Sequence, residues 1–463
     1  MQKIESQTPR QEANQTVRVE ISTSGGPSSI RIGFTDQRLT THGGMVVWSH
    51  FLQHHGFREA LSDLLPHSPS SPNAFTPSDT ALGLLGGIIS GADKLSRVAW
   101  LASDPAVAEV LGIEAIPSQS TLTRFLGVFS QRTSTELGKL HAWAASKLPS
   151  RKGGYTLDMD SWSLLHEDGH QEGVAVGYTR NGPKPCHRPL VAALAEAQVV
   201  VGYWLRSGNT NCVNGAAEFL RHTLNSLPRH VAVGLVRADS GFSHASVLDE
   251  LELRRMPYVM ATRLTKPIQS VCRHDDAAWE KTEMEGMEMQ ELDADQIGRR
   301  ILVLRQRIAR RPEAGGKMLL DVPGYRFQAL VTNLPRSMKP LAVWRRYNGR
   351  ADIENRIKEL GDQFGVKRLA CKGFWATEAL HQMAITAYNL CVLLQRRLGQ
   401  EGHVQLQTLR WRLFTRAAVW SRAQGKPTLK MAVRGKEQQA WWLQILEKLT
   451  AHPNCHAVGS LSA

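Results

Sequence analysis

The stretch Tyr155-Thr-Leu-Asp-Met-Asp-Ser-Trp162 decides the fold, because a strand pattern begins here after a long helical region. Apolar residues recur at helical spacing over much of 31–150, whereas from Gly154 onward they gather in short runs separated by turn residues. Strand and helix patterns then alternate up to residue 261. This alternation predicts an α/β core of order β-β-β-α-β-α-β. The expected elements are strands 155–165, 171–178, 199–205, 231–236 and 257–261 and helices 214–225 and 243–255.

Further regions lie on both sides of this core. Regular patterns lapse after Arg263, which predicts an insertion with its own strands. They resume as a strand at 325–332 and a long helix at 339–360. The predicted regions are a polar leader (1–30), a helical N-terminal region (31–150), an α/β core (151–263 and 325–375), a β-rich insertion (264–324) and a helical, basic C-terminal region (376–463).

The overall charge points to a polyanionic partner. The 463 residues include 56 Lys and Arg against 42 Asp and Glu, a formal charge of +14, which suits nucleic acid or a membrane surface. The longest apolar runs, 81–89 and 199–205, are well short of the roughly 18 residues that a membrane helix requires. Residues 1–16 are polar and do not resemble a secretion signal. These patterns predict a cytoplasmic protein that does not span a membrane.

Two segments are candidates for contacts with DNA. Pro117-Ser-Gln-Ser-Thr-Leu-Thr-Arg124 begins a capped helix, which fits either a helix-turn-helix with Arg124 facing a DNA groove or a helix of a structural bundle. Residues 394–437 hold ten Lys or Arg and two Glu. Within them Arg410, Arg412 and Arg416 lie among apolar residues at helical spacing, so one face can pack while the other meets phosphates. The alternative is a helical cap with a cationic surface.

Several common chemistries lack their motifs. The six cysteines form no Cys-x-x-Cys pair, and no Walker phosphate loop or dinucleotide-binding glycine motif occurs. His166-Glu-Asp-Gly-His170 matches the zinc-hydrolase motif His-Glu-x-x-His, which needs a helix to bring both histidines to one metal. Asp168-Gly169 instead predicts a hairpin turn that points the histidines apart. Stoichiometric zinc in the purified protein would favour the zinc hydrolase.

Three carboxylates lie where strands end or on a nearby helix. Asp160 is on the first strand, Asp239 follows the fourth strand, and Glu354 is on the helix 339–360. Acidic groups that converge from such positions can hold hard, oxygen-loving cations and leave room for phosphate oxygens. Each is ionised at neutral pH, so the cluster would need a metal to offset the repulsion.

The spacing of polar residues on the last of these elements adds detail. Tyr347, Arg350, Glu354 and Lys358 are three, four and four residues apart, which places them on one helical face. A metal-binding carboxylate would then be flanked by a phenol and two cations suited to phosphate. The same spacing also fits ordinary surface ion pairs worth a few tenths of a kcal/mol.

Together these residues resemble a known family. The chain resembles bacterial insertion-sequence transposases with an Asp-Asp-Glu site on a ribonuclease H-like fold. More narrowly, it is similar to the group marked by a Tyr-x2-Arg-x3-Glu-x6-Lys helix and, within that group, to the insertion sequence thirteen-eighty family. The matching stretches are Gln119-Ser-Thr-Leu-Thr-Arg124, Gln171-Glu-Gly, Gly177-Tyr178, Leu205-Arg-Ser-Gly-Asn-Thr210, Ala238-Asp-Ser-Gly-Phe242, Tyr347 to Glu354 and Ala387-Tyr-Asn-Leu390.

The resemblance implies a mixed sheet flanked by helices, with the insertion placed between the last core strand and the Glu-bearing helix. It implies Asp160, Asp239 and Glu354 as the catalytic, metal-binding acids, and Tyr347 and Arg350 as contacts to DNA phosphates. The spacing on the helix adds Lys358 to these phosphate contacts. Two Mg²⁺ ions, with Mn²⁺ as a substitute, would support cleavage and strand transfer. The implied partners are double-stranded DNA, as terminal inverted repeats and as target, and a second copy in a homodimer, within the bacterial cytoplasm or nucleoid. Trp279 or Trp344 could stack on an unpaired base.

The chain departs from the family pattern at two positions. The helix lysine of the family falls on Gly361, so Lys358 or Lys367 must replace it, and Trp162 stands where a hydroxyl residue is common. In addition, Asp158 faces the same side of its strand as Asp160, so position alone does not decide between them. The resemblance favours Asp160, because Ser161 follows it. The departures motivate an alternative function, a catalytically inactive, transposase-derived DNA-binding protein.

Overall fold

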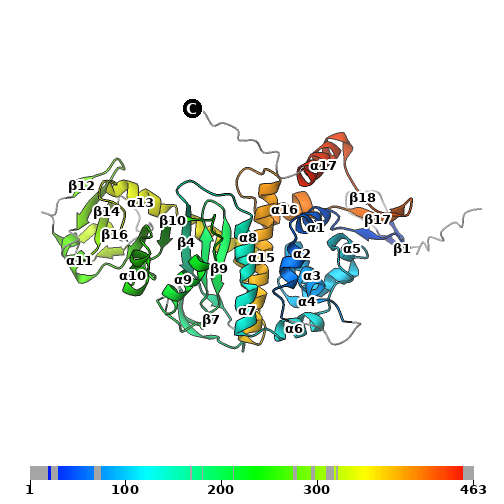
Figure 1. Ribbon diagram of the computed structural model, residues 1–463, viewed down its shortest axis with the longest axis horizontal. Coiled ribbons are helices and arrows are strands. Elements are labelled where there is room, and N and C mark those ends of the chain that lie inside the picture. Colours follow the sequence, from blue (N-terminus) through cyan, green and yellow to red (C-terminus); the bar gives the residue numbers. More distant parts are fainter. Residues whose placement is uncertain are drawn as a thin grey trace, which may run out of the picture.

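The computed structural model arranges the chain as three parts along its long axis (Figure 1). The N-terminal helices form one end, a large sheet fills the middle, and the strands of the insertion form the other end. Of the leader 1–30, only 19–21 and residue 30 fall within the described part. The structure describes residues 19–21, 30–66, 74–166, 169–179, 181–211, 213–274, 279–292, 298–308, 317–319 and 322–451.

The middle of the large sheet has the strand order of a ribonuclease H-like core. Strand β4 (Tyr155–Ser161) lies at its centre, with β10 (Val233–Ala238) and then β11 (Tyr258–Thr262) parallel to it on one side. On the other side β8 (Leu190–Leu194) is antiparallel to β4, and β9 (Val199–Trp204) is antiparallel to β8. Helices α9 (Ala216–Ser226) and α10 (Ala245–Leu253) connect β9 to β10 and β10 to β11. The predicted mixed sheet flanked by helices is confirmed.

A small second sheet interrupts the core between β4 and β8. Strands β5 (Leu164–Leu165), β7 (Gly182–His187) and β6 (Ala175–Thr179) pair in that order. The predicted strand 171–178 therefore belongs to this small sheet and not to the core. The core strand that follows, β8, has no counterpart in the sequence prediction, because all five of its residues are buried and show no alternation.

The insertion extends the core sheet. Strand β16 pairs antiparallel with both β11 and β14, and β13 continues the sheet beyond β14. The predicted strand content is present, and it forms one ten-stranded sheet with the core. The elements here are α11 (Lys266–Arg273), β12 (Glu280–Lys281), β13 (Met287–Leu292), β14 (Arg300–Arg307), β15 (Lys317–Leu319), β16 (Val322–Thr332), α13 (Pro340–Asn348) and α14 (Ala351–Asp362).

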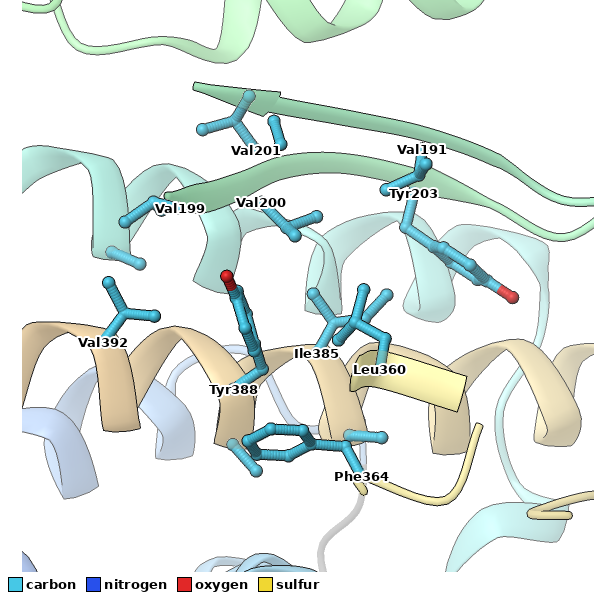
Figure 2. Close-up of a cluster of buried hydrophobic side chains, with 14 of the residues drawn as sticks. Val191, Val199, Val200, Val201, Tyr203, Leu360, Phe364, Ile385, Tyr388 and Val392 are labelled. Carbon is cyan, nitrogen blue, oxygen red and sulfur yellow. The ribbon is translucent and has the colours of Figure 1, made fainter. Parts of the chain in front are cut away.

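The long helix α15 (Phe374–Arg397) joins the sheet to the N-terminal helices (Figure 1). Twenty of its residues, Ala376 to Gln395, are buried in succession, so it is covered all round. Figure 2 shows its apolar side chains against those of β9 and α14. The Asn389 side chain also bonds both backbone groups of Val200, with its amide oxygen accepting at 2.9 Å and its amide nitrogen donating at 2.8 Å. This buried contact fixes the register of α15 on the sheet.

The terminal regions are mainly helical, as predicted, with one addition. Strands β17 and β18 form a hairpin that pairs with β3, so the basic C-terminal region is not helical throughout. None of the helices in the described ranges is both long and apolar enough to cross a membrane. The remaining elements are β1 (Val19–Ile21), β2 (Ile30–Ile32), β3 (Leu39–Thr40), α1 (Met45–His54), α2 (Phe57–Ser62), α3 (Pro77–Ser90), α4 (Leu95–Trp100), η1 (Leu101–Ser103), α5 (Val107–Leu111), α6 (Gln119–Gly127), α7 (Gln131–Leu137), α8 (Lys139–Ser146), α16 (Leu406–Leu409), η2 (Arg410–Phe414), β17 (Ala418–Ala423), β18 (Lys426–Met431) and α17 (Gly435–Thr450).

Candidate active site

The three predicted acids line one cavity of about 880 Å³. Asp160 lies near the end of β4, and Asp239 directly follows β10. Because these two strands are parallel neighbours, their carboxyl ends meet at the same edge of the sheet. Glu354 reaches the cavity from the first turn of α14. The topology therefore gathers residues that are far apart in the sequence.

Asp158 has a different environment from Asp160. Its side chain is 1% exposed and forms two bonds to the Arg237 guanidinium, at 2.6 Å from Nε and 2.8 Å from Nη2. Arg237 also donates from Nη1 to the Arg346 carbonyl at the end of α13, at 2.7 Å. A side chain at Gly349 would collide with this guanidinium. Asp158 is therefore part of a buried brace behind the cavity, and Asp160 is the aspartate of β4 that lines it.

Asp160 is buried among like charges. Its side chain is 9% exposed, and this burial, with the charges of Asp239 and Glu354, raises the pKa of Asp160 to about 6 against the opposing effect of Arg350. Arg350 Nη2 lies 3.2 Å from Asp160 Oδ2, and Nη1 lies 3.2 Å from Glu354 Oε1. One guanidinium thus bridges two of the three acids and offsets part of their repulsion.

The predicted helix 339–360 is two helices. α13 ends at Asn348 and α14 begins at Ala351, with Gly349 and Arg350 at the junction. Tyr347, on the first helix, is 9% exposed and packs with Val343 in an apolar cluster beneath the insertion. The structure places Arg350, Glu354 and Lys358 in the cavity lining and Tyr347 outside it.

Lys367 enters the cavity over Gly361. A Cβ on Gly361 would lie 2.8 Å from Cε and 3.0 Å from Cγ of Lys367, which is closer than side chains pack. The glycine thus leaves space for the Lys367 stem, and Lys367 lines the cavity together with Lys358. Its Nζ is 2.6 Å from Asp362 Oδ1. Lys367, from the loop after α14, therefore supplies the lysine that is absent at position 361.

Sequence reasoning missed part of the cavity wall. Arg188 lines it beside β7, and Tyr178 of β6 lines it with 74% of its surface exposed. Both come from the small sheet whose pairing was not predicted. The Gly177-Tyr178 match in the sequence was the available signal. Trp162 also lines the cavity, and its buried indole N–H has no hydrogen-bond partner among the described residues.

The three acids of the cavity suit a hard divalent cation, because all of them offer carboxylate oxygens. The charges of Asp239 and Glu354 also act on Asp160 and raise its pKa. Within the described ranges, no three His, Cys, Asp or Glu side chains already have an arrangement that could hold a metal ion. Arg350 instead spans Asp160 and Glu354. Metal binding would therefore require these side chains to move, with Arg350 giving up its bond to at least one acid.

The candidate DNA contacts have unequal surroundings. Arg124 is exposed on α6, and Arg412 is exposed on η2. Arg416 is half-buried and donates to the Arg412 carbonyl at 3.3 Å. Arg410 differs from the prediction, because it points inward and donates to the carbonyls of Ile88, Ile89 and Gln363. Its pKa is lowered by burial. It joins α3, α14 and η2 and is not available to DNA phosphates.

Neither histidine of the zinc motif lies on a helix. His166 follows β5, and its Nε2 is 3.0 Å from Nδ1 of His187, while His170 is exposed between β5 and β6. Glu167 and Asp168 lie outside the described residues. The two histidines therefore do not share the helical face that a zinc hydrolase requires, and this interpretation is wrong.

The two tryptophans proposed for base stacking are both engaged within the fold. Trp279 carries the Arg305 guanidinium 4.4 Å from its ring centre, and Trp344 donates to Gln328 at 3.2 Å.

Comparison with protein families confirms the transposase part of the resemblance. Residues 23–454 match the family described as transposase DDE domain, group 1. Among solved structures, the cryo-EM structure of the piggyBac transposase synaptic complex with hairpin DNA is similar at 11% sequence identity, with 81% of each chain covered and a TM-score of 0.43. No curated protein matches the chain.

Proposed function

Since the chain belongs to the transposase DDE domain family, group 1, we propose that it binds the terminal inverted repeats of its own insertion sequence, cuts there and joins the ends to target DNA. The observation that supports this proposal is the convergence of Asp160, Asp239 and Glu354 on one cavity with four cationic side chains in its wall. The finer membership, in the Tyr-Arg-Glu-Lys group and the insertion sequence thirteen-eighty family, is part of the same proposal.

The residues have separable roles in this proposal. Asp160, Asp239 and Glu354 would hold Mg²⁺ or Mn²⁺. Bound there, the metal would supply activation of a water or a DNA 3′-hydroxyl and stabilisation of the leaving 3′-oxygen. Lys358 and Lys367 would hold the phosphates of the strand end. Arg350 would exchange its carboxylate partners for a phosphate. Tyr347 is buried, but the charges of the three acids act on its phenol, so a phosphate contact from Tyr347 is also part of the proposal.

A charge-neutral substitution tests the catalytic assignment. Asp239→Asn should bind a duplex that ends in the element's own terminus as the wild type does, yet give no Mg²⁺-dependent cleavage. Asp36→Asn, at an exposed position of the N-terminal region, is the matched control and should cleave normally. Cleavage by Asp239→Asn at the wild-type rate would show that the site is assigned wrongly. Binding without metal-dependent cleavage by the wild type itself would favour the alternative, an inactive DNA-binding protein. Sedimentation of the DNA complex would test the proposed homodimer.

A further inference from the structure

A second groove lies beside the catalytic cavity, and its lining is basic without any carboxylate. It has a volume of about 470 Å³ and lies between helices α4 and α6 and the segment 368–373, which leads from α14 into α15. Its charged residues are Lys94, Arg368 and Lys372. Its other polar side chains are amides and hydroxyls that can donate to phosphate oxygens, namely Ser96, Gln119, Thr123 and Gln171.

Two of the three cations are available to a ligand. Lys94 and Lys372 are exposed, and neither forms an ion pair with any residue that the structure describes. Arg368 is also exposed, and its Nη1 lies 2.6 Å from Asp93 Oδ2. Asp93 is shared with Arg97, so the acid does not cancel the positive charge around the groove.

The groove and the catalytic cavity meet at one loop. Lys367 lines the cavity, and the next residue, Arg368, lines the groove. The far wall of the groove is α6, whose start is fixed by Ser118, because the Ser118 hydroxyl accepts from the Thr121 backbone N–H at 3.1 Å. Arg124 is exposed on the same helix. The segment 367–372 therefore supplies basic residues to both the cavity and the groove, and α6 of the N-terminal region forms part of the groove wall.

We propose that this groove holds the sugar-phosphate backbone of duplex DNA where it leaves the catalytic cavity. A polyanion fits the observations, because the groove is lined by three cations, no carboxylate and several side chains that can donate hydrogen bonds. Backbone contacts of this kind set the position of a duplex without reading its sequence. The groove would thus fix which phosphate reaches Asp160 and Asp239. This inference rests on the proposed function and identifies a DNA-binding surface for it.

The test is the salt dependence of DNA binding by Lys94→Ala/Lys372→Ala. The probe is a fluorescein-labelled duplex of mixed sequence, and anisotropy is measured in EDTA over a series of salt concentrations, so that cleavage does not interfere. Log K falls linearly with log salt, and each lost phosphate contact makes this slope shallower by about 0.9. The slope of the double variant should therefore be shallower by about 2. The same relation gives a Kd at 0.1 M salt that is roughly 50-fold higher.

The matched control removes two exposed cations from the opposite edge of the sheet. Lys152 and Arg229 precede β4 and β10, at the strand ends far from the acids. Lys152→Ala/Arg229→Ala should keep the wild-type slope, and Lys94→Arg/Lys372→Arg should recover most of the binding, since charge is retained. An unchanged slope and Kd for Lys94→Ala/Lys372→Ala would overturn the inference.

The outcomes separate this inference from the proposed function. Suppose that the wild type cleaves the terminus of its element with Mg²⁺ and that Lys94→Ala/Lys372→Ala binds DNA normally. The assignment of the groove as a DNA site is then wrong, and the transposase function stands. If the wild type never cleaves but the variant loses slope, the groove is a DNA site and the proposed activity is wrong.

Discussion

Asparagine at position 158 and at position 160 should change stability in opposite directions, although both aspartates share one face of β4. Asp158 forms the two short bonds to Arg237 in a site that is nearly fully buried. Burial raises the pKa of Asp158 too, against the opposing effect of Arg237, but Asp158→Asn leaves the Arg237 guanidinium buried without a counter-charge. Breaking a buried ion pair by removing one partner costs about 3–5 kcal/mol. We therefore expect Asp158→Asn to lower the free energy of unfolding by that amount.

In the absence of metal, Asp160→Asn should instead raise the free energy of unfolding. Burial raises the pKa of Asp160 to about 6, from 3.8 in the unfolded chain, so the folded state ionises this group less readily than the unfolded state does. Above pH 6 the ionised carboxylate therefore costs about 3 kcal/mol of stability, from 1.36 kcal/mol for each pH unit between the two pKa values. The asparagine removes this cost, but its single amide oxygen keeps only one of the two bonds, either from the Ser161 N–H at Oδ1 or from Arg350 at Oδ2.

Urea unfolding in EDTA measures both effects. At pH 8 the Asp160→Asn variant should be as stable as the wild type or more stable, by up to about 3 kcal/mol, and the gain should shrink at pH 5, where the wild-type carboxyl is largely protonated in the folded state. The Asp158→Asn variant should remain destabilised at both pH values. Equal destabilisation by the two substitutions, or a large loss only for Asp160→Asn, would refute the division of roles between the brace and the cavity.

Substitutions at three further positions test other parts of the structure. Burial raises the pKa of Glu378 to about 8, from 4.5 in the unfolded chain, so stability should fall as pH rises between these values, by up to about 1.4 kcal/mol per pH unit. In Glu378→Gln, the pH series of urea midpoints should lose this slope. Arg410→Met should lower unfolding free energy by about 2–4 kcal/mol, through three lost bonds to carbonyls, without changing the salt slope of DNA binding. Tyr178→Ala should weaken binding of a duplex with unpaired ends by about 1–3 kcal/mol in anisotropy titrations, whereas Tyr178→Phe should not, because stacking needs only the ring.

The sequence was sufficient to predict most of the core elements, except β8, and the positions of the acids on them, because these follow from local patterns. A strand that ends in Asp239 and a helix that carries Glu354 are visible without tertiary contacts. The choice between Asp158 and Asp160 is not local. It depends on the register of β4 against β10, which sets Arg237 opposite Asp158. No periodicity within either strand carries that information.

Prolines and a glycine explain why the sequence did not predict the remaining parts of the site. Strand β7 contains Pro183 and Pro185, which disfavour a strand reading, yet it forms the small sheet that brings Arg188 and Tyr178 to the cavity. Gly361 removes a family lysine at one position while making room for Lys367 at the same wall. A comparison of position 361 alone shows that the lysine is absent, whereas the packing shows that Lys367 takes its place.

The brace behind the site explains why the break between α13 and α14 falls where it does. Arg237 is held by Asp158 on β4 and in turn holds the last turn of α13 through the Arg346 carbonyl. Gly349 allows this approach, and Arg350 directly follows it. The guanidinium of Arg350 therefore emerges from a junction anchored to the same strand that carries Asp160. A buried ion pair of this kind adds little net stability, so its value here is geometric: it fixes the distance between the acids of the sheet and the acid of the helix.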